Sequence, residues 1–413
     1  MDRRDLLKAS AAGAVVLAAR GRVGGGQSAP ATVPDKAAAQ RKLGEHKIAK
    51  MSTRQIGDRY GRTTGPNARG SKCWRGANCL VRTVVTDRGA SGWAMSHWKP
   101  DVLRRFLGAR VGDLFDVTDG TAEDAMQLDK ILHDLAGNIL GVPAYRLMGA
   151  AGPTEVPAYS GAIYFDDLVP FDKPRGIAGV LAACRTDYEA GYRAFKLKMG
   201  RSYRWMKGPA GLKRDIEVTR AVRETFPDCQ VLVDANDGWT VEQAVEYVRA
   251  VADCGLYLIE EPFEESRDDL RRLKAAMAKH GCKAMIADGE RRHRQAKPLT
   301  RFGGYVREFT DRLFALAAEK LVDVLVLDLG IVGYTRWRRI MPELAKAGVQ
   351  AAPHTWCWTP RTYYTAQLAA GVGNVCIVEG IPGGARQVDY SAYRFRNGKL
   401  VVPDAPGFGL KLK

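Results

Sequence analysis

Residues 194–200 read AFKLKMG, an alternation of apolar and basic side chains that predicts a β-strand. Phe195 and Leu197 share one face of this strand, and Lys196 and Lys198 share the other. Burying an unpaired lysine ammonium is costly, so an isolated Lys-x-Lys strand is expected at a sheet edge with both lysines in water. The flanking sequence decides between this solvated edge and a buried site that supplies counter-charges.

Short β-like runs recur from Val156 onward and alternate with helical patterns. They cover residues 156–161, 194–200, 231–236, 256–262, 283–290, 323–329, 349–354 and 375–380. The helical patterns between them, such as TVEQAVEYVRAVADCG, end near glycines, as helices commonly do. Eight strands alternating with helices predict an α/β fold, a (β/α)-barrel over residues 156–380. An open doubly wound sheet is the alternative, but no G-x-G-x-x-G motif follows the first strand.

The segments outside this barrel have other patterns. Residues 45–155 predict an α+β capping domain, because two β-like runs flank the turn Asp87-Arg88-Gly89 and an amphipathic helical stretch follows. Residues 381–413 hold further alternating segments, which we expect to pack back on the capping domain. Among eight dispersed cysteines, only Cys73 and Cys79 lie close enough in sequence to indicate a local disulfide.

Residues 1–36 are predicted to be a signal peptide and linker. The stretch MDRRDLLKASAAGAVVLAAR places Arg3-Arg4 before an Ala/Val-rich run, as in a twin-arginine export signal, and a Gly-rich linker follows. We therefore expect an exported, periplasmic protein. The alternative is a disordered basic tail on a cytoplasmic protein.

The net charge of +17 over 413 residues raises the question of a nucleic-acid partner. The basic residues are scattered, and no zinc-finger, RRM or KH signature is present, so nucleic-acid binding is not expected. No apolar run reaches the length of a membrane span, so no membrane association is expected either. A basic surface favours acidic small molecules or polyanions as partners. We also expect a homo-oligomer.

The C-terminal ends of the predicted strands carry ionisable groups, and in such barrels the chemistry lies at those ends. Asp234, Glu260 and Glu290 are separated by 26 and 30 residues, about one βα unit each, so their side chains should converge at the barrel mouth. Periodicity alone does not distinguish Glu260 from Glu261. Three oxygen ligands favour Mg²⁺ or Mn²⁺ over zinc. The alternative is that these carboxylates only form ion pairs with the nearby lysines.

Two potential bases flank this predicted metal site. Lys198 should project into the same barrel mouth, where partial desolvation beside a dication would lower its pKa toward that of a useful general base. His354 ends the seventh strand and Asp328 the sixth, so the carboxylate can fix the imidazole tautomer as a dyad. A purely structural histidine is the alternative reading for His354. No function is expected for the other five: His46, His97, His133, His280 and His293.

The K-x-K, D-x-N, I-E-E-P, D-G-E and A-P-H elements resemble, in order, those of the enolase superfamily and its mandelate racemase-like subgroup. The similarity covers the chain from about residue 45 to the end. It implies a modified TIM barrel, (β/α)7β, with an N-terminal capping domain completed by the C-terminal tail. It further implies metal ligands at Asp234, Glu260 and Glu290, with Glu260 chosen over Glu261 by the family pattern.

The same resemblance implies roles around the metal. Lys198 is the base on one face, and His354 paired with Asp328 acts on the other. Lys196 lies beside the substrate carboxylate, and Glu379 matches the group that hydrogen-bonds the developing enolate oxygen. Asn236, in the D-x-N element, is a further substrate-binding candidate.

The implied reaction is metal-dependent removal of the proton α to a carboxylate, giving an enediolate. The resemblance favours dehydration of an acid sugar, because sugar acids are the commoner substrates of this subgroup. The polar and basic segment between Arg59 and Arg75 also suits a hydroxylated anion. Racemisation or epimerisation of a 2-hydroxy acid is one alternative, and a non-catalytic exported sugar-acid binding protein is another. A lactonising or dipeptide-epimerase activity is less favoured, because those relatives have lysine where this chain has Asp328.

Two stretches depart from the family pattern. Tyr334 interrupts a glycine pair after the sixth strand, and the segment that follows Glu290 is long and basic. Both are expected to border the site, so we expect them to affect substrate choice without disturbing the carboxylate triad.

Overall fold

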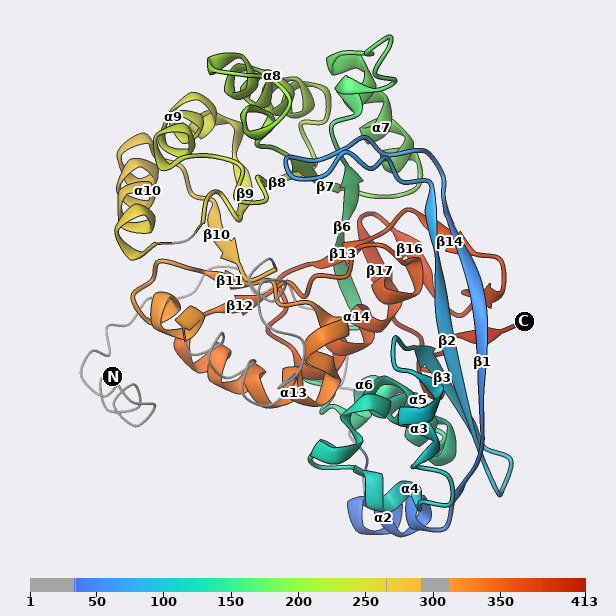
Figure 1. Cartoon of the computed structure of the whole chain (residues 1–413). Coiled ribbons are helices and arrows are strands. Elements are labelled where there is room, and N and C mark those ends of the chain that lie inside the picture. Colours follow the sequence, from blue (N-terminus) through green and yellow to red (C-terminus); the bar gives the residue numbers. More distant parts are fainter. Residues whose placement is uncertain (1–32, 34, 265, 291–311) are drawn as a thin grey trace, which may run out of the picture.

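The computed structural model describes residues 33, 35–264, 266–290 and 312–413 (Figure 1). The expected signal peptide, most of the linker, His293 and most of the basic segment after Glu290 lie outside the described residues.

The barrel is built from parallel strands, each hydrogen-bonded to the next along the chain. They are β6 (Glu155–Ile163), β7 (Ala194–Lys198), β8 (Gln230–Asp234), β9 (Leu256–Glu260), β10 (Met285–Asp288), β11 (Val324–Leu325), β12 (Gln350–Ala351) and β13 (Val378–Gly380). The last strand, β13, pairs with β6 in parallel, and a bridge between Ala351 and Val375 links it to β12. The sheet therefore closes on itself, and the doubly wound alternative is wrong.

Helices connect these strands and form the outer wall of the barrel (Figure 1). Those with described bounds are α7 (Ile177–Glu189), α8 (Pro209–Thr225), α9 (Val241–Val251), α10 (Arg267–His280), α13 (Leu329–Ala347) and α14 (Thr359–Val372). Helix α9 begins with a capping box in which Thr240 and Gln243 satisfy each other's backbone N–H groups. Helices α10 and α13 end at Gly281 and Gly348, both left-handed.

The barrel interior is filled by an apolar layer directly below the strand ends. It consists of Tyr159, Ala194, Leu232, Leu258, Ala287, Val324, Val326, Ala352 and Ile377. Side chains along a strand alternate between its faces, so the residue two positions later points into the same interior, closer to the barrel mouth. Leu232 is followed in this way by Asp234, Leu258 by Glu260, and Ile377 by Glu379. These carboxylates therefore lie directly above a packed apolar layer, which we call the apolar floor.

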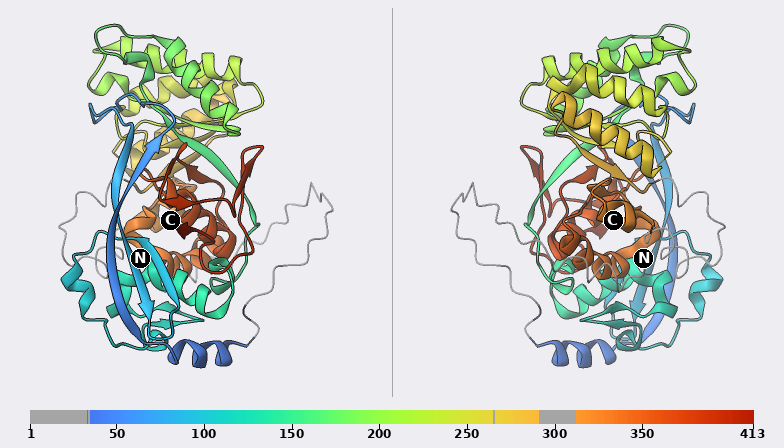
Figure 2. Two further views of the ribbon diagram at one scale, coloured as in Figure 1. Left: turned by 90° about the vertical axis from the view of Figure 1, so that its right-hand side faces the viewer. Right: turned by 90° about the vertical axis from the view of Figure 1, so that its left-hand side faces the viewer.

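The capping domain packs along one side of the barrel (Figures 1 and 2). Its sheet contains β1 (Ile48–Tyr60), β2 (Gly76–Thr86) and β3 (Ser91–Met95), and the expected turn at Asp87–Gly89 joins β2 to β3. Its helices are α2 (Lys36–Gly44), α3 (Pro100–Arg104), α4 (Val111–Leu114), α5 (Asp129–Leu140) and α6 (Ala144–Leu147), with a short hairpin of β4 (Phe115–Asp116) and β5 (Gly120–Thr121).

The C-terminal segment contacts this domain at several points. Strand β14 (Gly383–Ala385) pairs with β1, and the Phe408 N–H donates to Asp134 of α5. The remaining strands are β15 (Val388–Asp389), β16 (Arg394–Arg396), β17 (Lys399–Val401) and β18 (Lys411–Leu412). Strand β17 pairs with β6, so the tail also closes over the N-terminal edge of the barrel.

Several local expectations differ from the structure. Helix α2 begins nine residues before the expected start of the capping domain at 45, and the long strand β1 was not anticipated. No disulfide joins Cys73 and Cys79: both thiols are free, with Cys73 in the loop before β2 and Cys79 buried within that strand. In the part of the chain that is described, no helix has the length and hydropathy needed to cross a membrane.

Candidate active site

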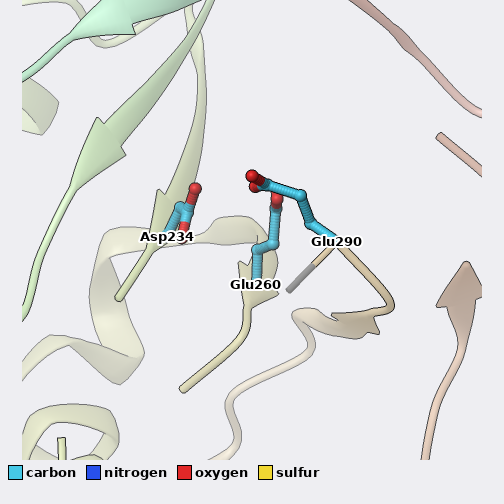
Figure 3. Close-up of side chains that lie close together, drawn as sticks. All are labelled: Asp234, Glu260 and Glu290. Carbon is cyan, nitrogen blue, oxygen red and sulfur yellow. The ribbon is translucent and has the colours of Figure 1, made fainter. Parts of the chain in front are cut away.

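Three carboxylates meet where β8, β9 and β10 end (Figure 3). Asp234 and Glu260 are the last residues of their strands and are register neighbours, and Glu290 follows β10 by two residues. One oxygen from each lies within 4.8 Å of the others, and all three side chains are buried. Glu261 is not part of this group, so the structure favours Glu260 as the converging glutamate. Three buried carboxylates whose oxygens come this close form an all-oxygen donor set, which fits a hard divalent ion.

Lys196 and Lys198 both point into this cluster from β7, and both are buried. The Nζ of Lys196 donates to both oxygens of Glu260, at 3.1 and 2.9 Å, and lies 3.6 Å from Glu379 Oε1. Lys198 donates to Asp234, its register neighbour on β8. The solvated-edge interpretation of the strand is therefore wrong, since each ammonium has a buried carboxylate partner.

Burial and charge act against each other in this cluster. Burial raises the pKa of Glu260 to about 7, although the Lys196 ammonium opposes the rise. Burial lowers the pKa of Lys198, but Asp234 and other carboxylates raise it, and the net pKa lies above that of an ordinary lysine. The pKa fall predicted for Lys198 is therefore not produced by the protein's own groups. A fall in the pKa of Lys198 requires an additional positive charge, such as a bound cation, that competes with Lys198 for Asp234.

His354 and Asp328 lie side by side at the ends of the next two strands, joined by a parallel bridge. The Nδ1 of His354 is 3.0 Å from Asp328 Oδ2, while its Nε2 is 3.4 Å from Glu290 Oε1. Burial lowers the pKa of His354, but Glu290, Glu379 and Asp328 raise it above the usual value. The imidazole is thus held at Nδ1 and presents Nε2 to the cluster.

Glu379 joins the lysine side of the site to the histidine side. Its Oε2 accepts a 2.7 Å hydrogen bond from the backbone N–H of Thr355 and lies 3.8 Å from His354 Nε2. Its Oε1 faces Lys196. Glu379 therefore contacts Lys196, Thr355 and His354 together, and its role at the enolate oxygen stays a prediction.

Asn236 lies beside the site in a left-handed turn, with φ of 49°. Its N–H donates to Asp234 Oδ1 at 2.9 Å, and its carbonyl accepts from Arg69 Nε at 2.9 Å. Arg69 also donates to the carbonyl of Asp237. The loop between β1 and β2 is therefore fastened to the backbone that follows a predicted metal ligand.

Sequence reasoning missed some residues that shape the site. Arg361 of α14 donates to Asp328 Oδ1 and to the Trp356 carbonyl, and Arg69 fastens the capping loop. Asp328 lies 33 positions from Arg361 and Asn236 lies 167 positions from Arg69, so no local pattern reveals these two contacts. Tyr334, expected to border the site, instead packs between His133 and Phe408 in the interface between barrel and capping domain.

The chain is similar in sequence and in structure to known proteins. The sequence profile of the "Enolase C-terminal domain-like" family matches residues 179–302 and 307–413. D-galactarolactone cycloisomerase of Agrobacterium fabrum is 27% identical over 303 residues, covering 69% of this chain and 70% of that protein. D-xylonate dehydratase of Haloferax volcanii is 26% identical over 377 residues, covering 81% and 82%.

A galacturonate dehydratase from a Geobacillus species has a closely similar solved structure. A variant of it with Mg is 30% identical, with a TM-score of 0.79 over 90% of this chain and 94% of that one. The same enzyme was solved with D-galacturonate and 5-keto-4-deoxy-D-galacturonate, at 29% identity and a TM-score of 0.78 over 90% and 95%.

Proposed function

Because this chain belongs to the Enolase C-terminal domain-like family, we propose that it removes the proton α to the carboxylate of an acid sugar and then eliminates water. The observation that carries this proposal is the placement of two bases around one carboxylate cluster. Lys198 contacts Asp234, whereas His354 Nε2 contacts Glu290. A carbon held over the cluster would therefore have Lys198 on one side and His354 on the other.

Asp234, Glu260 and Glu290 would hold a divalent cation, for which we propose Mg²⁺, with Mn²⁺ as a substitute. Support comes from their separation, their burial and the magnesium in the Geobacillus structure. When bound, the cation supplies the positive charge that stabilises an enediolate as it forms.

The protein's own groups would then act in two steps. Neutral Lys198 takes the α-proton, and the electrons of the C–H bond form the C=C bond of the enediolate. Lys196 holds the substrate carboxylate, and the carboxyl group of Glu379, 3.6 Å from Lys196, hydrogen-bonds the developing enolate oxygen. Protonated His354 then gives its Nε2 proton to the β-hydroxyl as the C–O bond breaks, which releases water and leaves an enol that becomes a 2-keto-3-deoxy acid.

This proposal is tested with D-xylonate, D-arabinonate, D-gluconate, D-galactonate and D-galacturonate in D₂O containing Mg²⁺. We expect at least one to exchange its α-proton and to accumulate a keto-deoxy acid, detected as its semicarbazone. Lys198→Met should abolish both signals. Exchange by the Lys198→Met variant at the wild-type rate would remove Lys198 as the base.

Racemisation or epimerisation is the second candidate, because the dyad of His354 and Asp328 is equally placed to return a proton to carbon. In that case the α-carbon inverts and no water is lost. Chiral chromatography of the recovered acid distinguishes this outcome from dehydration. Binding without exchange or turnover would instead favour a sugar-acid binding protein.

We also propose export through the twin-arginine pattern at Arg3-Arg4 and assembly into a homo-oligomer. Replacing both arginines by lysine should retain the protein in the cytoplasm of a host with this export system. Fractionation of the host measures the export, and sedimentation of the purified protein measures the assembly. Unchanged periplasmic yield, or a monomer in sedimentation, would contradict the corresponding proposal.

A further inference from the structure

Three aromatic rings form a continuous row from the lysine side of the site to the capping domain; we call this row the aromatic wall. It consists of Tyr164 after β6, Trp356 two residues after His354, and Tyr60 at the end of β1. The Tyr164 ring centroid lies 5.4 Å from Lys198 Nζ and 4.9 Å from the Trp356 ring. Trp356 in turn lies 5.6 Å from Tyr60.

The backbone around the wall is held by specific hydrogen bonds. The Tyr60 hydroxyl donates to the Cys357 carbonyl at 2.7 Å, across the boundary between capping domain and barrel. Arg361 donates to the Trp356 carbonyl at 3.0 Å, and the preceding N–H, that of Thr355, is bonded to Glu379. The backbone that carries Trp356 is therefore held by Arg361 and Glu379, residues that also contact Asp328 and His354.

One polar atom of this wall lacks a partner. The Nε1–H of Trp356 is buried, the residue is 7% exposed, and among the described residues no acceptor lies within hydrogen-bonding distance. Leaving a buried donor unpaired costs about 1–3 kcal/mol, so such a donor beside an active site is a natural contact for a ligand oxygen.

We propose that the aromatic wall packs against the carbon chain of the acid sugar and that Trp356 Nε1 donates a hydrogen bond to a hydroxyl beyond the β-carbon. This inference rests on the proposed function and identifies the residues that would select the substrate. A sugar acid presents an apolar C–H surface and regularly spaced hydroxyls, which the rings and the indole N–H complement. With the carboxylate near Lys196 and the α-carbon near Lys198, the distal carbons would extend along Tyr164 toward Trp356.

The chain offers a matched control. Trp337 is buried as well, and its Nε1 likewise has no acceptor among the described residues. It lies in α13, within the core shared by barrel and capping domain, and packs in the large apolar cluster rather than in the wall. Trp337→Phe therefore makes the same chemical change outside the site, while Trp356→Phe keeps an aromatic ring in the wall but removes the donor.

The experiment measures dissociation constants by calorimetry with Mg²⁺ for D-gluconate, D-galactonate and their 4-, 5- and 6-deoxy analogues, for wild type and both variants. We expect Trp356→Phe to weaken binding of a parent acid about 10- to 100-fold. For the deoxy analogue that lacks the hydroxyl bound by Trp356, the dissociation constants of wild type and Trp356→Phe should agree within twofold. Trp337→Phe should show no such dependence on the hydroxyl.

The possible failures separate the two proposals. The assignment of Trp356 is overturned if Trp356→Phe weakens the binding of every parent acid and every deoxy analogue by the same factor. It is also overturned if the substitution does not weaken binding at all. A hydroxyl-dependent loss in Trp337→Phe overturns it as well. Binding with the expected selectivity but without α-proton exchange overturns only the proposed dehydration. No binding of D-gluconate or D-galactonate overturns the assignment of Trp356, whereas no exchange with any of the five sugar acids overturns the proposed dehydration.

Discussion

Asp328 holds His354 through one oxygen and is itself held through the other. Its Oδ2 lies 3.0 Å from His354 Nδ1, and its Oδ1 accepts hydrogen bonds from Arg361 and from the N–H of Gly330 at the start of α13. The carboxylate is therefore fixed before substrate binds, and the imidazole presents Nε2 toward Glu290. This arrangement fixes both the tautomer and the orientation of the proton donor.

Asp328→Asn should lower turnover about 100- to 10,000-fold, because an amide cannot stabilise the protonated imidazole. Substrate affinity should change little, and α-proton exchange through Lys198 should persist. Semicarbazone formation and deuterium incorporation measure the two steps separately. Asp404→Asn is the control, since Asp404 pairs with Arg146 at the surface. Equal loss of exchange and turnover would contradict separate roles for the two bases.

Arg361→Lys should lower turnover about 10-fold or more while leaving KM nearly unchanged. A lysine retains the charge but cannot bridge Asp328 and the Trp356 carbonyl at the same time. The kinetic constants, measured separately, report this difference. A rise in KM with unchanged kcat would show that Arg361 serves binding rather than the position of Asp328.

The position of the site could be predicted from the sequence because it follows from strand periodicity. Leu232 and Asp234, or Ile377 and Glu379, are two residues apart, so an apolar floor residue is followed by a polar group on the same inner face. Strand ends in a barrel converge, so carboxylates at the ends of three successive predicted strands could be grouped, although Glu290 follows its strand by two residues and the choice of Glu260 came from the family pattern.

Other features depend on contacts that no local pattern contains. Arg69 reaches Asn236 across 167 positions, and Arg361 reaches Asp328 across 33. The choice of Glu260 over Glu261 depends on where β9 ends, and a boundary of one residue lies beyond what periodicity resolves. The pKa of Lys198 depends on the balance between burial and surrounding charge, which only the assembled cluster defines.

Removal of divalent metal should destabilise the protein, because three buried carboxylates then have only the Lys196 and Lys198 ammonium groups to offset their mutual repulsion. Mg²⁺ at about 100 times its dissociation constant should raise the free energy of unfolding by about 2.7 kcal/mol. Thermal denaturation in EDTA and in Mg²⁺ measures this difference. Glu290→Gln should lose most of the response to Mg²⁺ and should melt above wild type in EDTA, since one like charge is gone. A full Mg²⁺ response in that variant would exclude Glu290 as a ligand.

Asp58 should make stability depend on pH, independently of the active site. It is fully buried in β1, and its Oδ2 accepts a hydrogen bond from the N–H of Thr359 at the start of α14. Burial raises its pKa from 3.8 to about 6, even though this hydrogen bond opposes the rise. Because the folded state then binds the proton more tightly than the unfolded state, the stabilisation is complete below pH 3.8 and is lost as pH rises through about 6.

Asp58→Asn should therefore flatten the pH dependence of stability between pH 4 and 7. The variant keeps an acceptor for Thr359 but has no charge to bury, so its free energy of unfolding relative to wild type should rise with pH. The change should approach about 3 kcal/mol, from 1.36 kcal/mol for each unit of pKa shift. Urea denaturation across this range measures it, with Asp101→Asn at the exposed start of α3 as control. Parallel curves for wild type and Asp58→Asn would show that Asp58 stays ionised in the folded protein, with the hydrogen bond from Thr359 outweighing the cost of burial.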